Sequence, residues 1–288
     1  MKGCVNKKSQ VTIFMILAIV VLVVGGVIFY SISNSNYINN NFNNDVESVK
    51  YYIETCLQET SKKAIGFISS RGGYYHLPKY YYNNTFINTA YYIYYDDILI
   101  PSIEDIQHSI SEYIKSEVKN CFNDINNTQF TELNYQIQDI KTQITKNDVI
   151  VNAIIPTNIK RGSTYYKIEE FKINLEGERL YDIYTFSKLI VENHFRHKNS
   201  LCISCIINNT LAMNLYTDIE NIGNSTYIFT VMYNDTKSQV FKGFIFANKY
   251  KELSCTNIQY DVDEEFLKFF LMECVNQEIE KFKNTLKV

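Results

Sequence analysis

The cysteines are the residues whose type and spacing point most directly to chemistry in this chain. Cys4 lies near the amino terminus, and the other six of the seven follow later: Cys56, Cys121, Cys202, Cys205, Cys255 and Cys274. An even number of cysteines in an exported segment favours disulfide bonds. Cys56 and Cys121 fall on the apolar stripes of two expected helices and are predicted to pair, as are Cys255 and Cys274. The alternative is that they are small buried apolar residues.

Cys202-Ile203-Ser204-Cys205 has the two-residue spacing of redox-active thiols and of half a zinc site. A redox-active pair of the thioredoxin type would open a helix after a βα unit, and a structural zinc ion would need a second close pair of ligands. The sequence predicts neither arrangement. We therefore expect a local structural disulfide, with a thiol-disulfide protein or ectoenzyme using Cys202 and Cys205 as an alternative.

Other reactive side chains give weaker signals. His194 and His197 lie three apart on an expected helix, but Arg196 and Lys198 sit among them, which indicates a solvated charged face. Carboxylates gather where solubility and helix capping explain them: Asp96-Asp97, Glu169-Glu170 and residues 261–265. The sequence has no G-x-S-x-G, glycine-rich phosphate loop or H-E-x-x-H motif. We expect no catalytic, cofactor or metal site, and hence no enzyme.

Tyrosines form the densest aromatic cluster of the chain, between Tyr74 and Tyr95. Tyrosine suits a binding surface because it offers a large flat face and a hydroxyl group. Alternating positions on a strand face opposite sides, so about half of these side chains are expected in the core. The candidates for an interaction surface are the following: Tyr75, Tyr81, Tyr92 and Tyr94.

Residues 11–30 carry no charged side chain and have the length of a transmembrane helix, since about 20 residues at about 1.5 Å each span about 30 Å of hydrocarbon. Lys2, Lys7 and Lys8 precede the segment, and no Lys or Arg follows until Lys50. The positive-inside rule therefore places residues 1–10 in the cytoplasm and the carboxyl-terminal domain outside it. We expect a single-pass protein of the cell membrane; the competing interpretation is a cleaved secretory signal.

The junction Lys7-Lys8-Ser9-Gln10-Val11-Thr12-Ile13-Phe14 resembles the class III (type IV pilin-like) signal of archaea. That resemblance implies processing between Ser9 and Gln10 with the apolar helix kept on the mature chain. Pilins of this type carry a Glu where this chain has Phe14. The chain is also similar to uncharacterised single-pass membrane proteins of small-genome archaea, on the residues Val46-Glu47, Cys56-Leu57 and Gly72-Gly73-Tyr74. This second resemblance implies topology and no activity.

Beyond the membrane segment, apolar periodicity predicts an α+β domain with amphipathic helices and a mainly antiparallel sheet over residues 45–288, on a stalk of residues 31–44. An apolar stripe from Val46 stops at Gly72-Gly73, which predicts a first helix. Ser102 with Asp105 predicts the capping box of a second helix that packs beside it. A split into two subdomains near residues 123–134 is the alternative.

The remaining pattern indicates strands in blocks rather than a regular strand and helix alternation. Strands are expected within residues 74–95, 142–145, 149–155, 165–175, 213–220, 226–233 and 241–247, and helices at residues 180–195 and 262–286. Pro156 is expected to end the strand before it. Residues 201–207 are an apolar run of either type.

A net charge of −3 with scattered lysines leaves no basic face for phosphates, so nucleic acid is excluded as a partner. The leading hypothesis is a membrane-anchored cell-surface protein with a non-catalytic binding or structural role toward a protein or glycan. The alternatives are a type IV pilin-like filament or pseudopilin subunit, and the ectoenzyme or thiol-disulfide protein named above.

Overall fold

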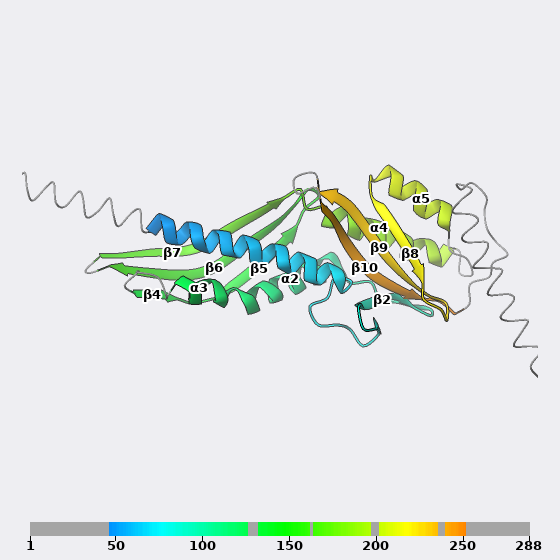
Figure 1. Ribbon diagram of the computed structural model, residues 1–288, viewed down its shortest axis with the longest axis horizontal. Helices are drawn as coiled ribbons and strands as arrows, with labels where there is room; N and C mark the ends of the chain where they lie inside the picture. Colours follow the sequence, from blue (N-terminus) through cyan, green and yellow to red (C-terminus); the bar gives the residue numbers. More distant parts are fainter. Residues whose placement is uncertain (1–45, 126–131, 162–163, 197–201, 236–239, 252–288) are drawn as a thin grey trace, which may run out of the picture.

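The fold is α+β, with two sheets that lie toward opposite ends of an elongated molecule (Figure 1). The structure is a computed structural model that describes residues 46–125, 132–161, 164–196, 202–235 and 240–251. Its helices are residues 46–70 (the first helix), α2 (Ile103–Glu117), α3 (Lys119–Ile125), α4 (Leu180–Arg196) and α5 (Ile203–Ala212). Among the described residues, no helix is both long and apolar enough to cross a membrane.

The first sheet is antiparallel throughout and is built around β6. Its strands are β4 (Glu132–Tyr135), β5 (Asp139–Ile144), β6 (Asp148–Arg161) and β7 (Thr164–Glu176). β4 and β5 pair with successive halves of one edge of β6, and β7 pairs along the other edge. Buried Val149, Val151 and Ile173 share one face, while Lys141 and Lys172 are exposed. This alternation is typical of a sheet with one covered and one solvated face.

β6 runs through Pro156 instead of ending before it, so the expected stop at Ile155 was wrong. The register against β7 shifts between Ile154 and Thr157, which places a β-bulge at the proline. A bulge leaves one residue outside the hydrogen-bonded ladder, and proline has no N–H to contribute there. The Pro156 carbonyl still accepts a hydrogen bond from the backbone N–H of Gln136 at 3.1 Å. The strand can therefore continue to Arg161.

α2 lies against the free edge of β5 and supplies hydrogen-bond acceptors to it. Ser111 Oγ accepts the backbone N–H of Thr142 at 2.9 Å, and Gln107 Oε1 accepts that of Ile144 at 2.8 Å. An uncovered edge strand invites pairing with another chain. The two side chains of α2 thus satisfy part of this edge from within the molecule.

The second sheet is mixed, so the expectation of a mainly antiparallel arrangement holds with one exception. Its strands are β1 (Tyr81–Asn83), β2 (Asn88–Tyr94), β3 (Asp97–Ile98), β8 (Tyr216–Asn221), β9 (Thr226–Asp235) and β10 (Val240–Lys249). The order is β1-β2-β10-β9-β8, with β3 also paired to β2. β2 and β10 are parallel and the other pairs are antiparallel. The parallel pair joins strands far apart in sequence, which no local turn signal encodes.

One apolar cluster extends through both sheets and the helices that cover them. Val49, Ile53 and Leu57 of the first helix are buried in it with strand residues such as Val151 and Phe229. Around the second sheet, α4 joins the same cluster through its buried side chains: Ile183, Phe186, Ile190 and Val191. The expected helix at 180–195 is confirmed, and the ambiguous run at 201–207 belongs largely to α5.

Several expectations lie outside the described residues. They are the transmembrane helix at 11–30, the stalk at 31–44, the processing site at Ser9 and Gln10, the pair Cys255 and Cys274, and the helix at 262–286.

Candidate functional site

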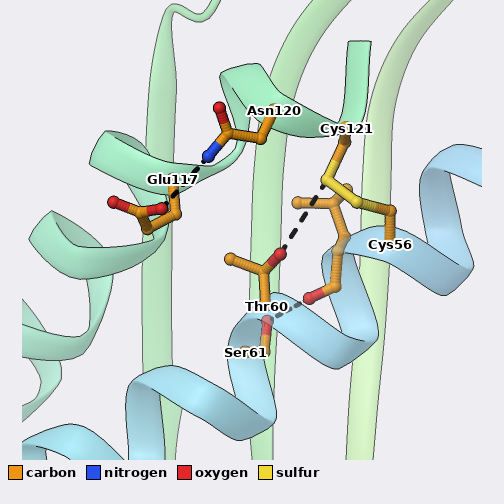
Figure 2. The surroundings of a disulfide bond; sticks show 7 residues. Cys56, Thr60, Ser61, Glu117, Asn120 and Cys121 are labelled. Atoms are coloured by element: carbon orange, nitrogen blue, oxygen red, sulfur yellow. Dashed lines mark hydrogen bonds between the residues drawn. A yellow bond between two sulfur atoms is a disulfide. The ribbon is translucent and has the colours of Figure 1, made fainter. Parts of the chain in front are cut away.

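A disulfide joins Cys56 of the first helix to Cys121 of α3, with the two Cα atoms 5.7 Å apart (Figure 2). This is the pair expected from the apolar stripes. Cys121 is fully buried, and its sulfur lies 3.8 Å from the Thr60 hydroxyl. On the neighbouring turn, Ser61 Oγ donates to the Leu57 carbonyl at 2.7 Å. Cys56 is partly buried, and the bond fixes the first helix to α3.

The second disulfide joins Cys202 to Cys205 within one turn. Cys202 is the N-cap of α5, so the motif does open a helix, contrary to expectation, although the element before it is the helix α4. Cys202 Sγ accepts the backbone N–H of Cys205 at 3.3 Å, as the oxygen of a serine N-cap would. Both cysteines are partly exposed. Sequence periodicity missed the helix because ten residues give too few turns for a clear stripe.

Most of the histidines and carboxylates considered as candidate sites have packing or ion-pairing roles in the structure. His194 is only 9% exposed and packs on the ring of Tyr250 at a centroid distance of 4.5 Å, so a solvated face was the wrong expectation for it. His197 and residues 261–265 lie outside the described residues. Glu169 is exposed and pairs with Lys167 at 2.7 Å. Within the described ranges, no cluster of three His, Cys, Asp or Glu side chains has a metal-binding arrangement.

The four tyrosines proposed as an interaction surface do not share one environment. Tyr92 is fully buried and stacks on Phe246 at 4.5 Å, so it belongs to the core and not to a binding surface. Tyr75 is partly buried and donates its hydroxyl hydrogen to Ser116 Oγ at 3.2 Å. Tyr94 is partly buried, and Tyr81 is 40% exposed. Only Tyr81 and Tyr94 therefore remain at the margin of the second sheet.

These two residues belong to a larger aromatic surface, here called the tyrosine edge, on β1, β2 and the turns that flank them. It comprises Tyr80, Tyr81, Tyr82, Phe86, Tyr94 and Tyr95. Tyr80 and Tyr82 pack on a small second core, and strand alternation turns Tyr81 to the other side of β1. Tyr80 stacks on Tyr94 at 4.5 Å, and Tyr95 meets Tyr94 edge-on at 4.7 Å. Phe86, in the turn between β1 and β2, is 92% exposed. Phe86 is the most exposed large apolar side chain among the described residues, and its turn joins the two tyrosine-bearing strands.

A small second core supports the tyrosine edge from below. Tyr91, Ile228 and Ala247 are buried there, apart from the main cluster. Burial raises the pKa of the Tyr91 phenol, so this hydroxyl stays protonated at neutral pH. The turn that presents Phe86 is fixed by Asn84, whose Oδ1 accepts the backbone N–H groups of Phe86 and Ile87 at 2.8 and 2.6 Å. The edge is therefore a positioned surface.

Two lysines lie over rings of the tyrosine edge. Lys79 Nζ lies 4.9 Å from the centre of the Tyr80 ring, and Lys249 Nζ lies 5.5 Å from that of Tyr95. Both contacts are within cation–π range. An aromatic surface bordered by lysines offers flat apolar area, hydroxyl groups and positive charge together.

A pocket of about 320 Å³ opens where the first helix meets the second sheet. Its lining includes Lys62, Ile65 and Gly66 of the first helix, Tyr233 of β9 and Phe241 of β10. An added Cβ at Gly66 would meet nothing within 4 Å, so this wall is open. The volume suits a small ligand.

A buried polar group forms one wall of this pocket. Glu178 is 5% exposed, accepts the Tyr233 hydroxyl at 2.7 Å and also pairs with Lys242. Lys242 pairs in addition with Asp235 at 3.0 Å. Burial and the adjacent Glu178 charge raise the pKa of Tyr233 far above its usual value. Glu178 is already engaged by the Tyr233 hydroxyl and Lys242, so we read this group as a structural ion pair.

Sequence reasoning missed Glu178 and Lys242 because they come together across a long stretch of chain. The available signal was weak: a Glu after Gly177 in a turn and a lone Lys in an apolar strand. The exposed Phe86 was also missed, since a single apolar residue in a turn carries no periodicity.

Comparison with known proteins found no matching family model, no matching curated protein and no matching solved structure.

Proposed function

We propose that this chain is a membrane-anchored protein of the outer cell surface that binds a protein or glycan partner through the tyrosine edge. The observation that carries the proposal is the exposure of three aromatic side chains at one margin of the second sheet, Tyr81, Phe86 and Tyr95, beside a turn that Asn84 fixes. Tyrosines and cations on a rigid support provide contact area at low entropic cost. The residues suit recognition, and no described cluster suits catalysis.

The membrane anchor in this proposal is the uncharged segment at residues 11–30, with lysines on its amino-terminal side. Two disulfides among the described residues support a location outside the cytoplasm, because thiols in the cytosol are kept reduced. The first helix begins close after the expected stalk. The binding domain would thus be held near the membrane surface.

The partner chemistry follows from the edge itself. Flat phenol rings stack on the apolar faces of sugars or on aromatic and proline side chains, and the hydroxyl groups exchange hydrogen bonds with polar groups. Lys79 and Lys249 favour acidic groups on the partner, while exposed Asp96 and Asp97 next to Tyr95 favour basic groups there.

The test is photo-crosslinking in cells that carry the full chain. A benzophenone amino acid replaces Phe86 or Tyr81, one position at a time, and the adducts are identified by mass spectrometry as protein, glycan or none. The control position is Tyr165 at the far sheet, which is 67% exposed. We expect a discrete adduct from the edge positions and none from Tyr165.

A second variant separates binding from folding. Tyr81→Ser, Phe86→Ser and Tyr95→Ser together should abolish the adduct formed from a benzophenone at Tyr82, because the neighbouring contacts are lost. The matched control combines Ile154→Ser, Tyr165→Ser and Tyr166→Ser, which are exposed to a similar degree on the first sheet. Equal adducts from both variants, or no discrete adduct at any edge position, would overturn the proposal.

A further inference from the structure

We propose that the Cys202–Cys205 disulfide is exchangeable and accepts two electrons from a dithiol, whereas the Cys56–Cys121 disulfide is structural. The inference concerns a surface distinct from the tyrosine edge and does not depend on the binding role. The proposal rests on the position of the pair on α5, on the groups around Cys202 Sγ and on the contrast with Cys56–Cys121, in which one cysteine is fully buried.

The position of Cys202 stabilises a thiolate. Cys202 caps α5, a helix of 10 residues whose first turn has no acidic side chain. Its Sγ accepts the Cys205 backbone N–H at 3.3 Å and lies 3.7 Å from the Ser204 hydroxyl. A helix N-terminus carries partial positive charge, and hydrogen-bond donors favour the charged form of sulfur. Cys205 lies further into the helix, so the two sulfurs are not equivalent.

Opening the bond would leave the two sulfurs close together. The Ile206 N–H donates to the Cys202 carbonyl at 3.1 Å, and Asn209 Nδ2 donates to the Cys205 carbonyl at 2.7 Å. Ile206, the next residue along α5, is buried in the main core. These contacts hold the first turn without help from the S–S bond. A dithiol in this turn is thus poised to close again.

The Cys56–Cys121 bond differs in the length of the loop that it closes and in the full burial of one of its cysteines. It closes a separation of 65 residues instead of 3. A longer closed loop removes more freedom from the unfolded chain, so this bond contributes more to stability. Cys121 is fully buried, so an incoming thiolate can reach this bond only at Cys56, whereas Cys202 and Cys205 are both partly exposed. Reduction should therefore reach Cys202 and Cys205 first.

The exchange balances with a dithiol as the reductant. A thiolate of the dithiol attacks Cys202 Sγ, an S–S bond forms between them, and Cys205 leaves as a thiolate that takes up a proton. The second thiol of the dithiol then loses its proton and attacks the dithiol's first sulfur, which is bonded to Cys202 Sγ in the mixed disulfide. Cys202 then leaves as the stabilised thiolate. The dithiol is oxidised to a disulfide, and the protein disulfide is reduced to a dithiol.

The first experiment titrates the full chain in mild detergent with dithiothreitol, followed by alkylation of free thiols and mass spectrometry. We expect Cys202 and Cys205 to become alkylated at a dithiothreitol concentration at least about tenfold lower than Cys56 and Cys121. The circular dichroism spectrum should stay unchanged over that first step. Opening of Cys56–Cys121 first, or of both bonds together, would overturn the proposal.

A second experiment tests the asymmetry of the two sulfurs. Cys205→Ser leaves Cys202 as the free thiol, and Cys202→Ser leaves Cys205. At about pH 6, Cys202 should react with iodoacetamide at least about tenfold faster than Cys205, because more of it is thiolate. Ser204→Ala in the Cys205→Ser chain should slow the reaction, while Ser70→Ala, a distant exposed hydroxyl, should not. Equal rates for the two thiols would refute an activated Cys202.

Discussion

Glu178 is the residue on which the polar contacts converge at the pocket between the first helix and the second sheet. It accepts the Tyr233 hydroxyl and pairs with Lys242, which Asp235 also contacts. Burial alone would lower the pKa of Lys242, but the hydrogen bonds and charges of Glu178 and Asp235 outweigh it and raise that pKa. The group is therefore a source of stability that depends on pH.

Glu178→Ala should reduce the free energy of unfolding by about 2 kcal/mol, because it leaves Lys242 and the Tyr233 hydroxyl without their main acceptor. Thermal unfolding at neutral pH measures the effect. The control is Glu192→Ala, since Glu192 and Lys188 are both more than half exposed and 3.8 Å apart. Equal melting temperatures for the two variants would contradict this account.

The sign of the pH dependence follows from the raised pKa of Lys242. The stabilisation by the pair is fully present below the ordinary pKa of 10.5 and is lost as pH rises through the higher pKa of the folded state. The difference in stability between the wild type and Glu178→Ala should therefore shrink above pH 10.5.

Gly73 follows the first helix with a φ of +90°, and a Cβ there would lie 2.9 Å from Ile106 Cγ1. Gly73→Ala should therefore cost both backbone strain and a clash, about 3 kcal/mol in total. Gly177→Ala separates the two effects, since Gly177 has a φ of +80° and open space around it. It should cost about 1 kcal/mol, measured by denaturant unfolding. A cost at Gly73 no greater than that at Gly177 would show that the contact with Ile106 is unimportant.

At the scale of elements, features encoded by local sequence signals were predicted correctly, whereas features that depend on long-range contacts were missed. The stripe of the first helix and the capping box at Ser102 are local, and the structure has both. The bulge at Pro156 and the parallel pairing of β2 with β10 depend on partner strands, and the sequence analysis missed both. The same reason explains why Tyr92 was assigned to the surface: alternation gives two faces but does not say which one is covered.

The capping box of α2 gives an element-scale prediction. Asp105 accepts the Ser102 N–H at 3.0 Å and its hydroxyl at 2.6 Å, and these bonds lower the pKa of the Asp105 carboxyl. Ser102→Ala should cost about 1 kcal/mol at neutral pH. Because the pKa of Asp105 is lower in the folded state, its charge stabilises the fold above the ordinary pKa of 3.8. This stabilisation is lost as pH falls through the lower pKa of the folded state.

The difference in the free energy of unfolding between the wild type and Ser102→Ala should therefore become smaller below pH 3.8. Circular dichroism during acid titration of both chains measures it. Ser70→Ala, at an exposed hydroxyl near the end of the first helix, provides the control. A gap that stays constant from neutral to acid pH would contradict a role for the Asp105 charge.

At the scale of the whole molecule, the two disulfides should differ in what they contribute. Replacing Cys56 and Cys121 by serine should cost about 4 kcal/mol, and replacing Cys202 and Cys205 about 2 kcal/mol, because the first pair closes the longer loop. Denaturant unfolding of the two double variants makes the comparison. A larger loss from the Cys202 and Cys205 variant would contradict the assignment of Cys56–Cys121 as the main covalent clamp.

Much of the candidate site depends on the whole fold. The Cys56–Cys121 pair followed from two apolar stripes alone. The tyrosine edge was located only in part, because Phe86 and Tyr95 owe their exposure to turns that periodicity does not describe. The Glu178 group requires the first helix, β9 and β10 to meet, and no short motif encodes that meeting.

The most direct test of the central claim, an anchored domain on the outer face of the cell, is lysine labelling of intact cells with a membrane-impermeant reagent. Mass spectrometry then maps the labelled positions before and after permeabilisation. Exposed Lys79, Lys141 and Lys172 should be labelled on intact cells. Lys7 and Lys8, which precede the apolar segment, should be labelled only after permeabilisation. Labelling of Lys79, Lys141 and Lys172 only after permeabilisation would contradict the account.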